Sequence, residues 1–373
     1  MRLITAFLLA LIVPGSLRAA PNDAQVGEIV ADVMTKRLQS DVAGAAVGVR
    51  VNSRTLFFNF GWANYASRQG ITSDSLFNLG SVGKVFDATL LSLLAHRGEV
   101  SLDDSVAKYI HELQEGGDVR GITFGQLVTF TSGFSVTHDN PPWWPAVHYT
   151  LPEFLRHLRG WKIDEKHRRG KDYIYSHSGF MLLHVALERR FGIPYAKLLE
   201  DRLLGPLDLP STILPLIGED ATGNIPPALK ERAVQGYSGE GKPIGKPGDM
   251  QGYYHWPGTG QMFSSLRDTS RFLAAHLLEL PIDPALAHAI KLTHQEVAPI
   301  ESTHGQAQAW EVHHPHWPII DKNGGLNNTT SYIGFIPKNR LGIVILMNRG
   351  NLNGRDFGHD ILLRLSRAES ALR

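Results

Sequence analysis

Residues 76–110 read LFNLGSVGKVFDATLLSLLAHRGEVSLDDSVAKYI, and this stretch is the most informative part of the sequence for the fold. A strand-like apolar segment ends at Gly80, and the spacing of apolar residues predicts a helix over residues 81–97. Ser81 and Lys84 form an S-x-x-K pair, one turn apart on the same helix face. The positive field of the helix N-terminus and a nearby amine both favour ionisation of the hydroxyl. The stretch therefore predicts a nucleophilic serine.

The setting of this motif is more informative than its spacing. About one S-x-x-K match is expected by chance in a chain of this length. Ser105 and Lys108 form a second match directly after a Leu-Asp-Asp turn, where an ordinary helix surface explains them. Only the first match combines a buried strand before the serine with a long apolar helix after it.

Composition limits the function classes. The 373 residues carry 37 Lys and Arg against 36 Asp and Glu, a net charge of +1, and 43% are hydrophobic. The apolar fraction supports a large core, and the even charge balance argues against a general nucleic-acid binder. The sequence has no cysteine, which excludes disulfides, thiol catalysis and Cys-ligated zinc. The 17 histidines are many for this length and call for a role.

Residues 1–20, MRLITAFLLALIVPGSLRAA, have the layout of a secretory signal peptide. A basic Arg2 precedes an apolar run from Leu3 to Val13, and small residues follow at positions 19 and 20. The run is shorter than the roughly 20 residues that span a bilayer. We therefore expect cleavage near residues 19–23 and a periplasmic mature protein without a membrane span.

The order of predicted elements indicates the fold class. A helix over 25–41 and a strand hairpin over 43–63 come first. Helical stretches follow at 100–112, 120–133, 151–160, 178–200 and 264–280, then strands at 331–337 and 341–347 and a helix at 357–367. We expect an α/β (α+β) fold in which an antiparallel sheet flanked by helices is formed from both chain ends. Its sheet-containing domain would comprise residues 21–80 and 236–373, the inserted all-helical domain residues 81–235, and the active site would lie between them.

At this point a family resemblance becomes visible. The stretch at 76–110 resembles the nucleophile region of class C β-lactamases and of their relatives, the serine penicillin-binding proteins and esterases. Residues 124–133 (FGQLVTFTSG) resemble the family's Leu-Thr-Ser-Gly helix end. Tyr175-Ser176-His177 stands where the family has Tyr-x-Asn, and Lys322-Asn323-Gly324 where it has Lys-Thr-Gly. The similarity covers essentially the whole mature chain and implies a β-lactamase/transpeptidase-like fold.

The resemblance implies a role for each matched residue. Ser81 would be the acylated nucleophile, Lys84 and Tyr175 would share the proton transfers, and the backbone N–H groups of Ser81 and Gly325 would form the oxyanion hole. Lys322 would hold a substrate carboxylate and tune Tyr175. Which of Lys84 and Tyr175 is the acylation base stays open, because the two titrate as a pair. The expected substrate-binding residues are His138, His177, Asn323, Gly324, Asn353 and Arg355.

Three departures from the family pattern affect substrate recognition. His177 replaces an asparagine, Asn323 replaces a threonine, and His138 aligns approximately with a glutamine. Two positions that recognise a side-chain amide in the family are thus histidines here. We expect altered specificity, for substrates without a bulky acylamino group such as carbapenems, or for an ester or peptide.

The histidines also raise the question of a metal. His138 and His177 could share a zinc ion, and the run EVHHPH adds His313, His314 and His316 as candidate ligands. Hydrogen bonding explains the first pair as well, and exposed loop positions explain the second group. The family mechanism requires no cofactor, so Zn²⁺ is a candidate rather than a requirement.

The leading hypothesis is an exported, monomeric serine hydrolase that opens small-molecule β-lactams through an acyl-enzyme on Ser81. A D,D-peptidase or an esterase of the same fold is the alternative within enzymes. A non-catalytic, metal-binding periplasmic module is the alternative from another class.

Overall fold

A nine-stranded sheet forms the centre of this computed structural model, which describes residues 21–134, 151–217, 223–249, 261–314 and 318–371. The strand order is β10-β11-β12-β13-β14-β15-β1-β2-β3, and all paired neighbours are antiparallel. The strands are β1 (Gly44–Val51), β2 (Arg54–Asn64), β3 (Gln69–Gly70), β10 (Ala298–Glu301), β11 (His304–Gln306), β12 (Glu311–His313), β13 (Ile319–Leu326), β14 (Thr329–Ile336) and β15 (Leu341–Met347).

The two ends of the chain meet in the middle of this sheet. β1 pairs with β15, with Val47 opposite Ile345. Both strands are buried along nearly their whole length, as their uninterrupted apolar sequences require. The predicted hairpin over 43–63 and the two predicted strands at 331–337 and 341–347 are confirmed within about two residues.

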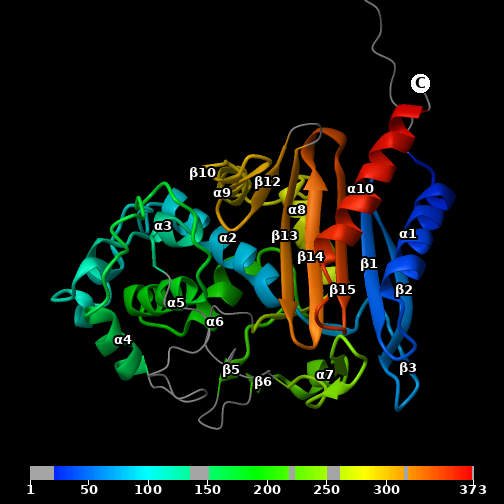
Figure 1. The fold of residues 1–373 in the computed structure, drawn as a ribbon, viewed down its shortest axis with the longest axis horizontal. Helices are drawn as coiled ribbons and strands as arrows, with labels where there is room; N and C mark the ends of the chain where they lie inside the picture. The colour runs from blue at the N-terminus through cyan, green and yellow to red at the C-terminus, as the bar shows by residue number, and fades with distance from the viewer. Residues whose placement is uncertain (1–20, 135–150, 218–222, 250–260, 315–317, 372–373) are drawn as a thin grey trace, which may run out of the picture.

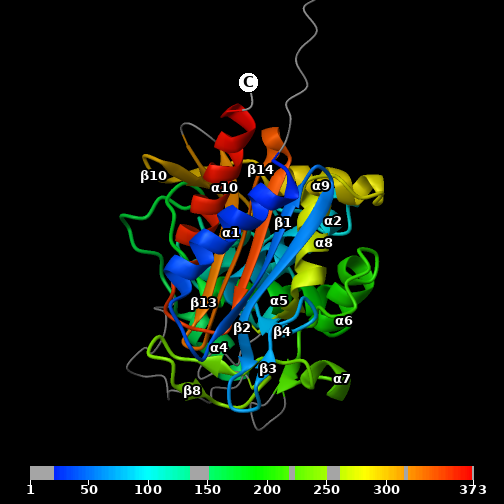
Figure 2. The same cartoon turned by 90° about the vertical axis from the view of Figure 1, so that its right-hand side faces the viewer.

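Helices cover both faces of the sheet. On one face, α1 (Asp23–Leu38) packs beside α10 (Gly354–Ala371), as Figure 2 shows. The apolar sides of these two helices form one core with the residues of β1 and β15 that face them. On the other face lie α8 (Leu266–His276), α9 (Pro284–Thr293) and α2 (Gly83–His96). The expected sheet of both chain ends, flanked by helices, is therefore confirmed.

The middle of the chain is mainly helical and lies to one side of the sheet, at the left of Figure 1. It contains α3 (Phe124–Val128), α4 (Leu151–Arg159), α5 (His177–Phe191) and α6 (Tyr195–Leu199), followed by one π-helical turn, η5 (Glu200–Leu204). The described residues also form three two-stranded ladders and the short helix α7 (Pro227–Lys230). The ladders pair β4 (Leu76–Asn78) with β9 (Phe263–Ser265), β5 (Leu216–Ile217) with β6 (Gly223–Asn224), and β7 (Gly236–Tyr237) with β8 (Pro243–Ile244).

Three predicted helices are shorter than expected. The helix over 178–200 is interrupted, because Gly192 adopts a left-handed conformation and Pro194 has no N–H to continue the hydrogen bonding. The stretch over 120–133 contains only the five residues of α3, which ends before Phe130 with its positive φ of 53°. Residues 100–112 form short 3₁₀ turns.

Two histidines pack against the larger core, with His276 buried and His294 partly buried. His276 Nδ1 and His294 Nε2 are 2.8 Å apart, and both rings pack against Trp310. Burial lowers the pKa of His294 to about 3 and that of His276 well below its ordinary value. Both rings are therefore neutral near neutral pH. Across the described ranges, no helix is long and apolar enough to cross a membrane.

Candidate active site

Ser81 lies in a 3₁₀ turn (Gly80–Val82) that continues directly into α2. Gly80, with a φ of +49°, supplies the left-handed conformation that the turn needs, and its N–H donates to Asn78 Oδ1 at 2.8 Å. The sheet holds this turn from the other side, because Ser331 Oγ on β14 donates to Leu79 O at 2.6 Å. Ser81 is thus fixed by a strand far away in the sequence.

Strand β13 passes so close to this turn that it tolerates only glycine at one position. A Cβ on Gly324 would lie 2.4 Å from Leu79 O and 3.0 Å from Val82 N. A Cβ on Gly80 would lie 3.0 Å from the backbone N of Gly325. The Gly325 amide therefore lies beside the turn that carries Ser81, which is the placement that an oxyanion hole needs.

Tyr175 connects the helical region to the serine. Its hydroxyl donates to Ser81 Oγ at 2.6 Å, and its ring stacks on Phe130 with the centroids 4.6 Å apart. Burial alone would raise the pKa of Tyr175, but the positive charges of Lys84 and Lys322 lower it below its ordinary value. The phenol oxygen is thereby made a better proton acceptor at neutral pH.

Lys84 reaches the same ring from α2. Its side chain is buried, its Nζ lies 5.6 Å from the centroid of the Tyr175 ring, and His177 Nδ1 lies 3.5 Å from that Nζ. Burial lowers the pKa of Lys84, Lys322 lowers it further, and Tyr175 and Asp87 oppose this shift only in part. Lys84 is therefore a lysine that can give up its proton.

Lys322 approaches the Tyr175 ring from strand β13 and, unlike Lys84, makes a direct contact with a carboxylate. Its Nζ lies 5.0 Å from the Tyr175 ring centroid and donates to Glu311 Oε1 at 3.2 Å. Burial would lower the pKa of Lys322, but the carboxylate of Glu311 and the phenol of Tyr175 raise it above its ordinary value. Lys322 thus remains a fixed positive charge, well suited to hold an anionic group of a substrate.

Arg355 is engaged within the protein. Its Nη2 donates to Glu311 Oε2 at 2.7 Å, and its Nε and Nη2 donate to the two oxygens of Asp321 at 3.1 Å each. The exposed Asn353 accepts a hydrogen bond from the Arg355 backbone N at 3.2 Å. Arg355 therefore contacts the carboxylate that holds Lys322, and no motif in the sequence predicts this ion-pair network.

One histidine cluster of the described residues has side chains that could ligate a metal together. His313 Nε2 lies 3.0 Å from one oxygen of Asp321, and His359 Nε2 lies 2.7 Å from the other. Burial would raise the pKa of Asp321, but the two histidine hydrogen bonds and Arg355 hold it well below its ordinary value. Each oxygen of Asp321 accepts from one histidine and from Arg355, so this cluster is satisfied by hydrogen bonds and already includes a cation.

Two other predicted metal ligands have neighbours of their own. His314 pairs with Glu296 at 2.6 Å, and His177 lies at Lys84. His138 and His316 lie outside the described residues. Asp321 and His359 were missed by the sequence analysis, although His359 follows Arg355 by four residues and so shares its helix face.

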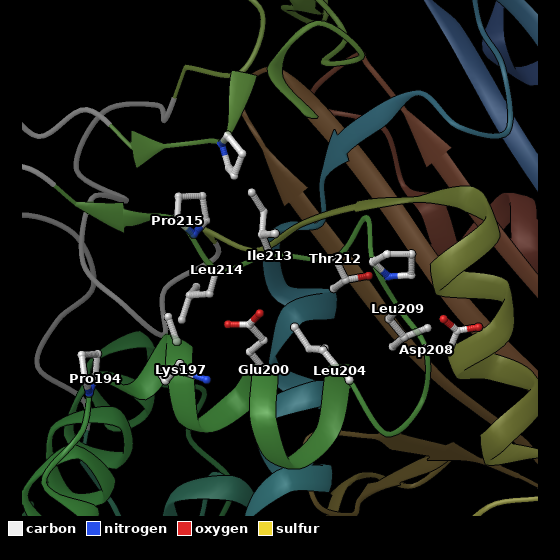
Figure 3. A pocket seen from close by; sticks show the side chains of 14 residues that line it. Pro194, Lys197, Glu200, Leu204, Asp208, Leu209, Thr212, Ile213, Leu214 and Pro215 are labelled. Carbon is white, nitrogen blue, oxygen red and sulfur yellow. The ribbon is translucent and has the colours of Figure 1, made fainter. Parts of the chain in front are cut away.

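Two hollows border the helical region. A pocket of about 620 Å³ lies against α6 and η5, and Figure 3 shows its lining, which includes Leu204, Ile213 and Leu214. A much smaller cavity, of about 10 Å³, is lined by Lys84, and Leu214 lines this cavity too. Leu214 is therefore a wall that the two hollows share.

Comparisons with known proteins agree with this arrangement. A family model described as β-lactamase matches residues 26–368. A β-lactamase of Lysobacter lactamgenus is 28% identical, over 94% of this chain and 93% of that protein. Among solved structures, a mutant of a class C β-lactamase superposes with a TM-score of 0.78 at 23% identity, over 92% of this chain and 98% of that chain. A structure titled β-lactamase/D-alanine carboxypeptidase from Pseudomonas syringae gives a TM-score of 0.77 at 23% identity, over 91% and 98% of the two chains.

Proposed function

Because the chain belongs to the β-lactamase family, we propose that it is a class C-like serine hydrolase that opens β-lactams through an acyl-enzyme on Ser81. The observation that carries the proposal is the 2.6 Å hydrogen bond between Tyr175 and Ser81, with the Nζ atoms of two buried lysines within 5.6 Å of the centroid of the phenol ring. This is a nucleophile in contact with an activated base.

The proposed reaction has two halves. In acylation, the Tyr175–Lys84 pair accepts the Ser81 proton while Oγ forms a bond to the lactam carbonyl carbon. The backbone amides of Ser81 and Gly325 stabilise the oxyanion, and the C–N bond then breaks as its nitrogen takes up the proton. In deacylation, a water gives a proton to the same pair, attacks the ester, and Ser81 leaves with the proton restored.

We assign substrate recognition to the strand side of the site. Lys322 would hold the substrate carboxylate, together with Asn323 and Gly324. Asn323 Oδ1 is buried and has no hydrogen-bond partner among the described residues, so its capacity to accept a hydrogen bond is unused. The ion pairs of Arg355 and the exposure of Asn353 favour an indirect role, in which Arg355 orients Glu311 and thereby Lys322.

The specificity that we propose follows from the histidines. His177 contacts Lys84 where the family has a neutral amide, and this supports a preference for substrates without an acylamino group, such as carbapenems. The role of His138 stays a prediction, because this residue lies outside the described residues.

A D-alanine carboxypeptidase activity is the second candidate. It is favoured by the likeness to the structure titled β-lactamase/D-alanine carboxypeptidase. The acyl step would be the same, and the two activities would differ in the leaving group and in the rate at which water removes the acyl group.

Location and domain division complete the proposal. The signal-like residues 1–20 support export to the periplasm, where the protein would act as a monomer. Two domains, 21–80 with 236–373 and 81–235, would each contribute to the site. Lys322 and Gly325 come from the sheet, and Lys84 and Tyr175 come from the helical segment.

The first test is turnover of a penicillin, a cephalosporin and a carbapenem by the purified mature protein and by its Ser81→Ala variant. We expect wild-type turnover and a loss in the variant of at least about 10³-fold, because the nucleophile is gone. The matched control is Ser105→Ala, in the second S-x-x-K match, which should keep wild-type rates. Residual activity above a few per cent in Ser81→Ala would reject the acyl-enzyme.

The same assay addresses the metal. We expect a chelator to leave the rates unchanged, because no step above uses a metal. A loss of activity that zinc restores would instead favour a metal role for the cluster of His313, Asp321 and His359. Turnover of a D-alanyl-D-alanine peptide without any lactam turnover would favour the carboxypeptidase.

A further inference from the structure

A buried carboxylate lies behind Lys84. Asp87 follows Lys84 by three residues on α2 and is only 3% exposed. The hydroxyl of Tyr195, on α6, donates to Asp87 Oδ1 at 2.7 Å, and His184 Nε2, on α5, lies 3.1 Å from the same oxygen. The rings of His184 and Tyr195 stack with centroids 3.6 Å apart. Asp87 is therefore contacted from two further helices, α5 and α6.

Lys84, Asp87 and His184 face a common cavity. It has a volume of about 10 Å³, close to the space that one water molecule needs. His184 is 2% exposed, and neither of its ring nitrogens makes an aligned hydrogen bond with the described residues, despite the short distance to Asp87. The cavity is thus bordered by an ammonium, a carboxylate and an unsatisfied polar ring, which a single water could join.

The position of Asp87 is not explained by the packing of α2. The residues around it on this helix are almost all buried and mostly apolar. Burying a carboxylate is costly unless an opposite charge lies near it. Lys84, which shares the cavity, supplies that charge. Each of the two lysines near Tyr175 thus has a carboxylate close to it. Lys322 is hydrogen-bonded to Glu311, and Lys84 shares a cavity with Asp87.

We propose that Asp87 is a positioning residue that holds the ammonium form of Lys84 from the core side, with one water joining Lys84, Asp87 and His184 in the cavity. This inference rests on the proposed function, in which Lys84 and Tyr175 share a proton. It is supported by the effect of the Asp87 charge, which raises the pKa of Lys84 against the lowering by burial and by Lys322.

Several other charged or titratable groups lie near Lys84 and Asp87. Lys84 faces Tyr175 and, from α5, His177, while Lys322 and its partner Glu311 approach from the sheet. Asp87 faces His184 and Tyr195, and Glu188 of α5 accepts a hydrogen bond from the backbone of Tyr195. Asp87 is the one carboxylate among them that borders the cavity of Lys84.

The test is the pH dependence of kcat/KM for Asp87→Asn with a chromogenic cephalosporin. Asparagine keeps the shape and the oxygen that accepts from Tyr195, but removes the charge. Without that charge the Lys84–Tyr175 pair loses its proton more readily, so the acid limb should move to lower pH by about one unit. Asp87→Thr, which is also neutral and of similar volume, should give the same shift and replaces Asp87→Asn if that variant does not fold.

The matched control is Ser92→Ala, which alters a buried side chain of the same helix that bonds to Ala289 O, away from the site. Its acid limb should coincide with that of the wild type. An acid limb that stays in place in an active Asp87→Asn enzyme, at whatever rate, would overturn the inference and leave Asp87 a packing residue. If the wild type does not hydrolyse the cephalosporin, the pH dependence of Ser81 labelling by a fluorophosphonate gives the same readout. If the wild type is not labelled either, the proposed function itself fails.

Discussion

The chemistry of this site is set by the different surroundings of two lysines on one tyrosine. Lys322 has a carboxylate at 3.2 Å and a raised pKa, whereas Lys84 is buried without such a direct contact and has a lowered pKa. In the proposed mechanism Lys322 would therefore act as a fixed charge and Lys84 as a group that exchanges a proton. Tyr175, which lies near both lysines, would pass the proton in either direction.

His177 is the residue where specificity is most directly testable. Its ring lies edge-on to Tyr175, with centroids 5.1 Å apart, and contacts Lys84. We expect His177→Asn to change the ratio of kcat/KM between a penicillin and a carbapenem by about tenfold, because a side-chain amide is restored. The melting temperature should change little, since the residue is only half-buried.

Steady-state rates on both substrates measure this ratio. His314→Asn is the control, since His314 pairs with Glu296 elsewhere on the protein. A ratio that stays the same in His177→Asn would mean that this position does not contact the substrate.

The motifs predicted which residues would meet, but not what would surround them. The structure brings Ser81, Lys84, Tyr175 and Lys322 together, as the resemblance of three motifs to the class C β-lactamase family led us to expect, and their roles stay predictions. The motifs gave no role to Asp87 and did not pair Glu311 with Lys322. The role of a carboxylate depends on the side chains that neighbouring strands or helices bring next to it. Glu311 lies close to Lys322 only because β12 pairs with β13. Local spacing carries no signal of such a contact.

At the level of single helices, the spacing of apolar residues predicted where helices occur but not where they end. α5 stops at Gly192, although Gly-Ile-Pro at 192–194 is a recognisable stop signal. The second S-x-x-K match lies in a 3₁₀ turn, where Ser105 accepts from Ala107 N and Lys108 pairs with Asp104. These are the local contacts of a surface turn, as the sequence context indicated.

The contact between β13 and the nucleophile turn gives a prediction at this scale. Gly324→Ala would place a Cβ against two backbone atoms of the turn, so the strand and the turn must move apart. We expect a loss of about 10²-fold or more in kcat/KM, because a shift of this size misplaces catalytic groups. The fold should survive, as judged by circular dichroism.

The control is Gly70→Ala on the edge strand β3, where a Cβ meets nothing within 4 Å. This variant should keep the wild-type rate. Wild-type activity in Gly324→Ala would show that the turn can adjust without cost and that the close contact does not position Ser81.

At the scale of the whole molecule, the buried histidine pair ties stability to pH. The pKa of His294 falls from 6.5 to about 3 on folding, so below pH 6.5 the unfolded chain binds more protons than the folded one. Stability is therefore lost as the pH falls through this window, by roughly 1 kcal/mol per pH unit for each such histidine. His294→Gln should remove its share of this slope.

Urea unfolding at several pH values between 7 and 4 measures the slope. His111→Gln, which alters an exposed histidine, should keep the wild-type slope. A wild-type slope in His294→Gln would show that His294 is accessible to protons in the folded protein.

The fold class was predictable because strong signals lie at both ends of the chain. The apolar runs of β1 and β15 have the length and composition of buried strands, and a helical segment separates them. The far edge of the sheet was not predictable. β11 and β12 have three residues each and contain histidines, so residues 311–316 resembled an exposed loop. Only pairing with β13 makes them strands.

The pairing of the chain ends also controls when the protein can become active during synthesis. Leu79, two residues before Ser81, is held by Ser331, 252 residues later. Strand β1 cannot pair with β15 until the end of the chain has been made. Contacts this distant in sequence form late and slowly in folding. A nascent chain that already contains Ser81 therefore has no assembled catalytic centre. Activity should appear only after the last strands have docked, and until then the exposed partners of β1 are open to aggregation and to chaperones.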